Sequence, residues 1–156
     1  MVTNTSEQTL KTVCMKTIET EITINCEPSA VWKILDDFEK YPEWNPFIKS
    51  IKGDKFPGGK LEVELEPPEG KRMKFNPDVL NYEENREIRW KGKLGIKGIF
   101  DGEHYLILND NRNGTTTFIH GEKINGILVP FVGGTLTKTR FGFEFMNLSL
   151  KERCEQ

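Results

Sequence analysis

The sequence predicts an α+β fold, in which a curved antiparallel sheet of seven strands packs against one long C-terminal helix. Seven segments between residues 17 and 126 alternate apolar and polar side chains, as half-buried strands do. The glycines of GKLGIKG, at residues 92–98, indicate a bend that lets the sheet curl. From about Val129 to Arg153 the strand alternation stops and apolar residues recur at helical spacing, which predicts the helix.

The first strand is predicted at residues 17–26, and two short helical segments follow it. Pro28 suits a first helical turn, so the first helix is expected over Ser29–Asp37. A second turn lies between Pro42 and Pro46 in a stretch rich in aromatic residues. We interpret Tyr41–Phe47 as a hydrophobic plug or a lid, and as the entrance to a pocket.

A meander of six further strands is expected after residue 47. Its first members are 47–53, 60–66, 71–80 and 87–91, and Pro77 should interrupt the third of these at an edge or a bulge. The last two strands lie on either side of the polar turn NDNRNG within Gly98–Gly126. If the turn is centred near Arg112, Leu106 lies opposite Phe118.

The same register places His104 opposite His120, and these are the two histidines of the chain. Glu122 shares their face, together with the apolar residues Phe100 and Phe118. Two imidazoles and a carboxylate among apolar side chains predict a lined pocket rather than a solid core.

The predicted helix is apolar on more than one side. Val132, Leu136, Thr139, Phe143, Met146 and Leu150 form one stripe, and Phe141, Phe145 and Leu148 widen it, so we expect it to be covered on more than one side. Gly133, Gly134 and Gly142 are unfavourable in a helix interior, which predicts a close approach or a space left for a ligand.

Composition limits the classes of partner. Residues 1–16 read as a loose lead-in and 17–156 as one domain. The 22 basic and 24 acidic residues are interspersed and give a net charge of −2, which argues against nucleic-acid binding.

The sequence has neither a membrane-spanning apolar run nor a signal peptide, so we expect a cytoplasmic protein, monomeric or weakly dimeric, that is not inserted in a membrane. Three cysteines without a CxxC pair indicate reduced thiols.

Four phrases of the sequence carry a family resemblance that covers residues from about 17 to 154. They are PSAVWKILDDFEKYPEWNPFI, EIRWKGKLGIKGIFDGEHYLIL, TTFIHGEKINGILVPF and FEFMNLSLKE. With the order of elements, they resemble the START-like superfamily, in particular its SRPBCC or polyketide cyclase/dehydrase-like group, which is similar to the birch pollen allergens. The resemblance implies a helix-grip fold, with the last helix packed on the concave face of the sheet around a hydrophobic cavity.

The sequence favours a noncatalytic binder of a small hydrophobic molecule such as a lipid, a quinone or a polyketide-like compound. One alternative is a cyclase/dehydratase-type enzyme with His104, His120 and Glu122 as candidate acid/base residues. Another is a protein-interaction module of the chaperone-activator or ribosome-associated toxin kind. The sequence contains no P-loop, GxGxxG, GxSxG or HExxH motif, and we expect no cofactor and no metal.

The predicted ligand-binding residues are the aromatic, apolar and polar side chains expected on the concave face. Ordinary core packing explains any one of them alone, but together they are a large set for one sheet and one helix. They are Trp44, Phe47, Met73, Phe75, Trp90, His104, Phe118, His120, Glu122, Phe131, Leu136 and Phe143. Arg140 is a further candidate, as a partner of Glu122 or of a ligand carboxylate.

Overall fold

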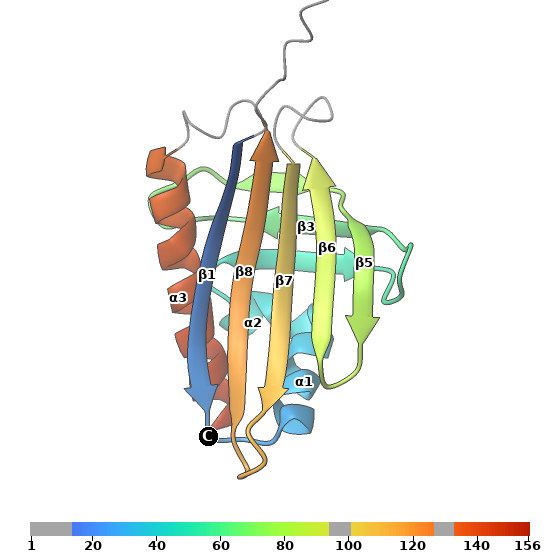
Figure 1. The fold of residues 1–156 in the computed structure, drawn as a ribbon, viewed down its shortest axis with the longest axis vertical. Coiled ribbons are helices and arrows are strands. Elements are labelled where there is room, and N and C mark those ends of the chain that lie inside the picture. Colours follow the sequence, from blue (N-terminus) through green and yellow to red (C-terminus); the bar gives the residue numbers. More distant parts are fainter. Residues whose placement is uncertain (1–13, 94–100, 127–132) are drawn as a thin grey trace, which may run out of the picture.

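Eight antiparallel strands form a curved wall in the computed structural model, which describes residues 14–93, 101–126 and 133–156. Five strands lie side by side in the order β1-β8-β7-β6-β5, and β2-β3-β4 form a second sheet that crosses behind them (Figure 1). The sheets meet where Lys60 forms a β-bridge with Asp78. The strands are β1 (Cys14–Ile24), β2 (Ile48–Gly53), β3 (Leu61–Leu65), β4 (Met73–Phe75), β5 (Asp78–Glu83), β6 (Glu87–Lys93), β7 (Asp101–Asp110) and β8 (Thr116–Gly126).

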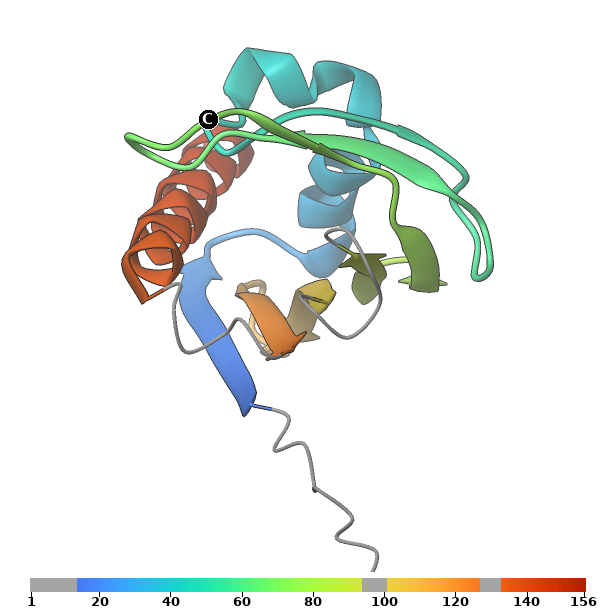
Figure 2. The same ribbon diagram turned by 90° about the horizontal axis from the view of Figure 1, so that it is seen from above.

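Helices close the open sides of this wall. They are α1 (Pro28–Asp36), the 3-10 helix η1 (Phe38–Lys40), α2 (Tyr41–Trp44) and α3 (Gly133–Cys154). Seen from above, α3 runs between β1 and the smaller sheet (Figure 2). Both α1 and α2 contact α3, and Arg153 near the end of α3 forms an ion pair with Glu43 of α2. This is the predicted helix-grip arrangement. In the described part of the chain, no helix is long and apolar enough to cross a membrane.

The described residues form eight strands in two sheets rather than the seven strands of one sheet that were predicted, and the extra strand arises because residues 71–80 do not form one strand. β4 ends at Phe75 and β5 begins at Asp78, on either side of Pro77. A proline has no N–H to donate to the ladder, so the strand divides there. β1 begins at Cys14, three residues before the predicted start at Thr17. The start of the predicted C-terminal helix, 129–132, lies outside the described residues.

The register of the β7–β8 hairpin differs from the predicted one by two residues. Leu108, not Leu106, lies opposite Phe118, and His104 lies opposite Glu122 instead of His120. The turn is therefore centred on Asn113, with Arg112 (φ 56°) and Gly114 (φ 82°) in the left-handed region. Because side chains alternate with a period of two, this shift leaves both histidines on the predicted concave face.

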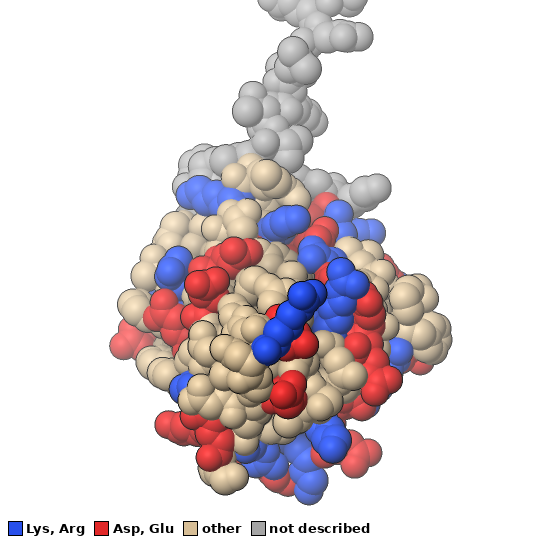
Figure 3. Space-filling model, turned by 60° about the horizontal axis from the view of Figure 1, so that its bottom comes forward, with Lys and Arg blue, Asp and Glu red and all other residues tan. Residues whose placement is uncertain are grey.

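One side of α3 packs into the core, and another side is exposed. Phe143, Met146 and Leu150 are fully buried, whereas Phe141, Phe145 and Leu148 are each about half exposed. The expectation that the whole apolar surface of the helix is covered is thus wrong for these last three residues. On the face shown in Figure 3, acidic and basic side chains are interspersed, as the sequence predicted.

Gly142 lies where α3 packs closely against Phe47. A Cβ atom at this position would lie 2.4 Å from Cδ2 of Phe47, whereas none of the described atoms lies within 4 Å of the corresponding position at Gly134. Close approach therefore explains Gly142 but not Gly133 or Gly134.

We expect Gly142→Ala to lower the free energy of unfolding by about 1–2 kcal/mol, because overpacking against Phe47 outweighs the gain in helix propensity. Gly134→Ala is the matched control and should leave stability unchanged or raise it by up to about 1 kcal/mol. Urea unfolding followed by tryptophan fluorescence measures both changes. Equal effects of the two substitutions would contradict the close packing at Gly142.

Candidate functional site

Two histidines meet in the interior of the protein. His104 of β7 and His120 of β8 are both almost fully buried, and their Nε2 atoms lie 2.9 Å apart. Leu106 lies directly opposite His120, and His104 is two residues before Leu106 on the same face of the sheet. The two histidines are therefore diagonal neighbours on adjacent strands, which brings their rings together. At that distance one Nε2 donates a hydrogen to the other, so the two imidazoles form one hydrogen-bonded unit.

Thr20 and Asn147 extend this unit to β1 and α3. Asn147 Oδ1 lies 3.1 Å from Nδ1 of His120, and its amide nitrogen donates to Thr20 Oγ1 over 2.9 Å. The Thr20 hydroxyl in turn donates to the backbone carbonyl of His120. Since Asn147 Oδ1 can only accept, Nδ1 of His120 carries the hydrogen and its Nε2 accepts from His104. The four side chains thus form one directed chain of hydrogen bonds.

Burial keeps both imidazoles neutral. Desolvation lowers the pKa of His104 well below its usual value, and the neighbouring His120 lowers it further. Desolvation also lowers the pKa of His120 to about 3, although its hydrogen bonds to Asn147 and to the Phe143 carbonyl oppose the shift. Neither ring carries a charge near neutral pH.

Aromatic rings hold the pair in place. His104 stacks on Trp90 with ring centroids 4.5 Å apart, and His120 stacks on Phe143 at 3.8 Å. Phe47 lies edge-on to Phe143 with centroids 5.3 Å apart. These contacts fill most of the space between the sheet and α3 with side chains.

A small cavity remains beside His104. It has a volume of about 40 Å³, and its lining is mostly apolar: Val63, Leu65, Phe75, Pro77, Trp90, Gly92, Lys93, Gly102, His104 and Glu122. A volume of roughly 10–15 Å³ suffices for one water molecule, whereas pockets that enclose a drug-sized ligand measure about 300–1,000 Å³. A larger ligand therefore requires side chains around the cavity to move.

Glu122 places a carboxyl group on this cavity without a partner among the described residues. Its carboxylate lies over Gly102, where a Cβ atom would come within 2.5 Å of Oε1. Desolvation alone raises the pKa of Glu122 to about 7. The group thus exchanges its proton near neutral pH, beside an imidazole that stays neutral.

Comparison with known proteins identifies the family to which the chain belongs. Residues 15–154 match the family described as polyketide cyclase / dehydrase and lipid transport. The chain belongs to this family. None of the curated proteins compared with the chain matches it.

Solved structures share the fold of this polyketide cyclase/dehydrase family member at low sequence identity. A START superfamily protein from Mycobacterium smegmatis is 21% identical, with a TM-score of 0.69 over 90% of this chain and 97% of its own. Ara h 8.0201 is 16% identical, with a TM-score of 0.67 over 91% and 99%. The Zhui aromatase/cyclase from Streptomyces sp. R1128 is 13% identical, with a TM-score of 0.64 over 91% and 94%. These likenesses show the helix-grip fold alone.

The structure of this family member places the predicted ligand-binding residues in three groups. Phe75, Trp90, His104 and Glu122 line the small cavity, and Phe47, Phe118, His120 and Phe143 pack directly behind it in the core. Trp44, Met73 and Leu136 are partly buried and do not line the cavity. Phe131 and Phe100 lie outside the described residues.

Two roles assigned from the sequence are not supported by the geometry. Arg140 forms an ion pair with Glu144 over 3.2 Å on the surface of α3, so it does not bridge to Glu122. The segment Tyr41–Phe47 is a plug rather than the entrance to the cavity: Tyr41 is fully buried and its hydroxyl donates to the Leu35 carbonyl. The cavity itself is lined by residues of β3, β4, β6, β7 and β8, and by no described residue of the Tyr41–Phe47 segment.

Sequence reasoning missed Thr20 and Asn147 as partners of the histidines. Both are polar residues at inward positions of otherwise apolar stripes, and buried polar residues of this kind need partners. That signal was available in the pattern of the first strand and the last helix. Among the described residues, no group of three or more His, Cys, Asp or Glu side chains is placed to hold a metal ion.

Proposed function

We propose that this protein binds a small, mostly apolar molecule in the cavity between the smaller sheet and strands β6–β8, with the polar end of the ligand at Glu122 and His104. The observation that carries the proposal is the desolvated, unpartnered Glu122 carboxyl on an apolar cavity. A partly buried, desolvated carboxyl without a partner lowers stability, and such costs are typical of functional sites. A ligand hydroxyl or carbonyl would supply the missing hydrogen bond.

Gly92→Val tests this proposal by filling the cavity. Gly92 lines the cavity, and among the described atoms a Cβ there meets only Cβ of Pro77, at 3.8 Å. Valine also favours strands, so the variant should fold at least as stably as the wild type.

In a thermal-shift screen with a library of lipids, quinones and aromatic polyketide-like compounds, we expect ligands that raise the Tm of the wild-type protein, because binding to the native state stabilises it. The same ligands should shift Gly92→Val far less. Gly134→Ala, at an exposed position that does not line the cavity, is the control and should respond like the wild type. Equal shifts in all three proteins would argue that the ligand binds elsewhere.

Acid/base catalysis on the bound ligand is a second candidate, favoured by the pKa of about 7 at Glu122 beside a neutral imidazole. The matching reaction class is dehydration of a β-hydroxy ketone: a base removes the α proton, an acid protonates the leaving hydroxyl, and an enone and water form. Enone absorbance reports turnover. If the protein catalyses the step, Glu122→Gln should lower kcat much more than it changes KM, whereas simple binding gives no turnover above buffer.

A further inference from the structure

The free edge of β1 is long and regular. β1 has 11 residues, contains no proline, and pairs with β8 without a register irregularity along its whole length. The opposite edge of the five-stranded sheet, β5, has 6 residues and an irregularity between Val79 and Asn81. Proteins usually blunt exposed edges with short strands, bulges or prolines, because an open edge can pair with another chain. β5 follows that pattern and β1 does not.

The backbone groups on this edge belong to the odd-numbered residues of β1. At its C-terminal end the carbonyl of Thr23 accepts a hydrogen bond from Lys151 Nζ over 2.8 Å, and the N–H of Asn25 donates to Glu155 over 2.7 Å. Alternation along the strand means that the N–H and C=O groups of Glu21, Glu19 and Thr17 point the same way. Within the described part of the chain, these three residues have no backbone partner on that side.

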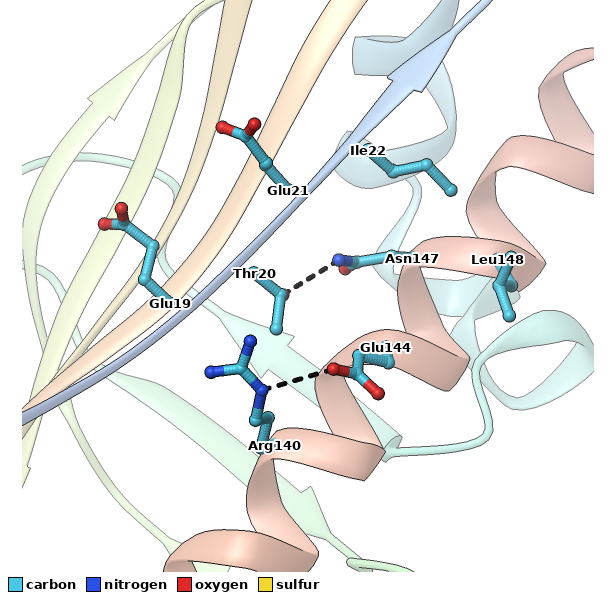
Figure 4. Close-up of a pocket in the computed structure, with 8 residues that line it drawn as sticks. All are labelled: Glu19, Thr20, Glu21, Ile22, Arg140, Glu144, Asn147 and Leu148. Carbon is cyan, nitrogen blue, oxygen red and sulfur yellow. Dashed lines mark hydrogen bonds and ion pairs between the residues drawn. The ribbon is translucent and has the colours of Figure 1, made fainter.

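A groove runs along this edge. It has a volume of about 570 Å³ and is lined by Glu19–Ile22 of β1 and by one face of α3 that includes Glu144 and Leu148. Figure 4 shows Thr20 and Ile22 directed toward the helix, with Glu19 and Glu21 on the other side of the strand. Ile22 and the half-exposed Leu148 provide apolar surface. Among the described residues, none lines both the groove and the cavity at Glu122.

The charges on the groove select its occupant. Arg140 and Glu144 form an ion pair and largely cancel, which leaves the exposed Glu19 and Glu21 as the acidic groups on the strand, with Glu19 accepting a hydrogen bond from the neutral Tyr105 hydroxyl. A second copy pairing antiparallel with the same edge would bring these carboxylates close to their symmetry mates, and like charges on neighbouring strands are destabilising. An extended chain with basic side chains has the complementary charge.

We propose that the edge of β1 binds an extended peptide as an added antiparallel strand, with lysine or arginine at alternate positions facing Glu19 and Glu21 and apolar residues facing Ile22 and Leu148. Backbone hydrogen bonds to Thr17, Glu19 and Glu21 supply affinity, and the side-chain pattern supplies selectivity, as in other cases of β-strand addition. This binding surface is separate from the proposed ligand cavity and does not depend on it.

The test uses the full chain, labelled with ¹⁵N, and an acetylated hexapeptide of alternating lysine and valine. Titration at low salt should shift the amide resonances of Thr17, Glu19 and Glu21 and slow their hydrogen exchange, and added salt should weaken binding. Glu21→Lys should weaken binding at least about tenfold, whereas the same charge change at the exposed Glu39 should have little effect.

Glu21→Pro removes only the outward donor, because the N–H of Glu21 does not face β8, and it too should weaken binding. If this variant does not fold, Glu21→Lys with its Glu39→Lys control decides the question. The proposal is overturned if the lysine peptide leaves the β1 amides unshifted, or if a hexapeptide of alternating glutamate and valine binds equally well. It is also overturned if the same amides shift with protein concentration alone, which would show a self-association.

Discussion

Replacing His120 with leucine is expected to lower the free energy of unfolding by about 2–4 kcal/mol, because two buried polar groups then lose their partner. The N–H of His104 and Oδ1 of Asn147 both bond to His120, and none of the three residues is more than slightly exposed. Leucine keeps the volume close to that of the imidazole, so the loss reports the hydrogen bonds rather than a cavity. Urea unfolding at neutral pH measures it.

The double variant His120→Leu, Asn147→Leu shows whether the loss comes from the network. Removing Asn147 as well eliminates the stranded acceptor, so the double variant should be less destabilised than the sum of the two single variants, by about 1–2 kcal/mol. Strict additivity would mean that the two side chains do not interact. Leu136→Ala, at a partly buried position outside the network, is a suitable reference and should combine additively with His120→Leu.

Glu122→Gln is expected to stabilise the protein at alkaline pH and to have little effect under acidic conditions. The pKa of Glu122 is raised from 4.5 to about 7 in the folded protein, so between these values the native state holds a proton that the unfolded state has lost. Stability therefore falls as the pH rises through this window, and glutamine removes the titration. We expect the variant to be about 1–2 kcal/mol more stable than the wild type at about pH 8, less than the full shift implies, because the side chain is partly exposed.

Comparing the stability of the wild type with that of Glu122→Gln separates the contribution of Glu122 from that of the histidines. The folded-state pKa values of His104 and His120 lie below the ordinary value of 6.5, so their contribution is full above that pH and is lost as the pH falls below it. Both proteins contain these histidines, and their contribution cancels in the difference. A difference that does not change between about pH 5 and pH 8 would show that the Glu122 carboxyl is solvated or paired.

Much of this architecture follows from local patterns in the sequence. The alternation in Leu61–Leu65 and in the β7–β8 hairpin predicts strands correctly, and Pro77 marks the place where one predicted strand divides into β4 and β5. The family resemblance implies the helix-grip fold, which the structure and its likeness to Ara h 8.0201 confirm.

The register of the hairpin could not be read from the sequence. NDNRNG offers several residues that adopt turn conformations, and the hydrophobic pattern cannot distinguish registers that differ by two, because both place the same residues inward. The predicted concave face was therefore right, while the predicted partner of His104 was wrong.

The contents of the site depend on contacts between segments far apart in the chain. Phe47 fills the space above Gly142, which leaves a smaller cavity than the aromatic composition suggested. Asn147 meets His120 only because α3 lies against the sheet. Neither contact has a local signature beyond a glycine or a polar residue at an inward position.

Native mass spectrometry of the purified protein, alone and with the compounds that raise its Tm, tests most directly whether the cavity at Glu122 holds a ligand. We predict a noncovalent complex with a small organic molecule for the wild type and for Gly134→Ala, and its loss in Gly92→Val, whose added side chain occupies the cavity. A wild-type protein that retains no compound, or a Gly92→Val variant that retains it to the same extent, would contradict the proposed binding site.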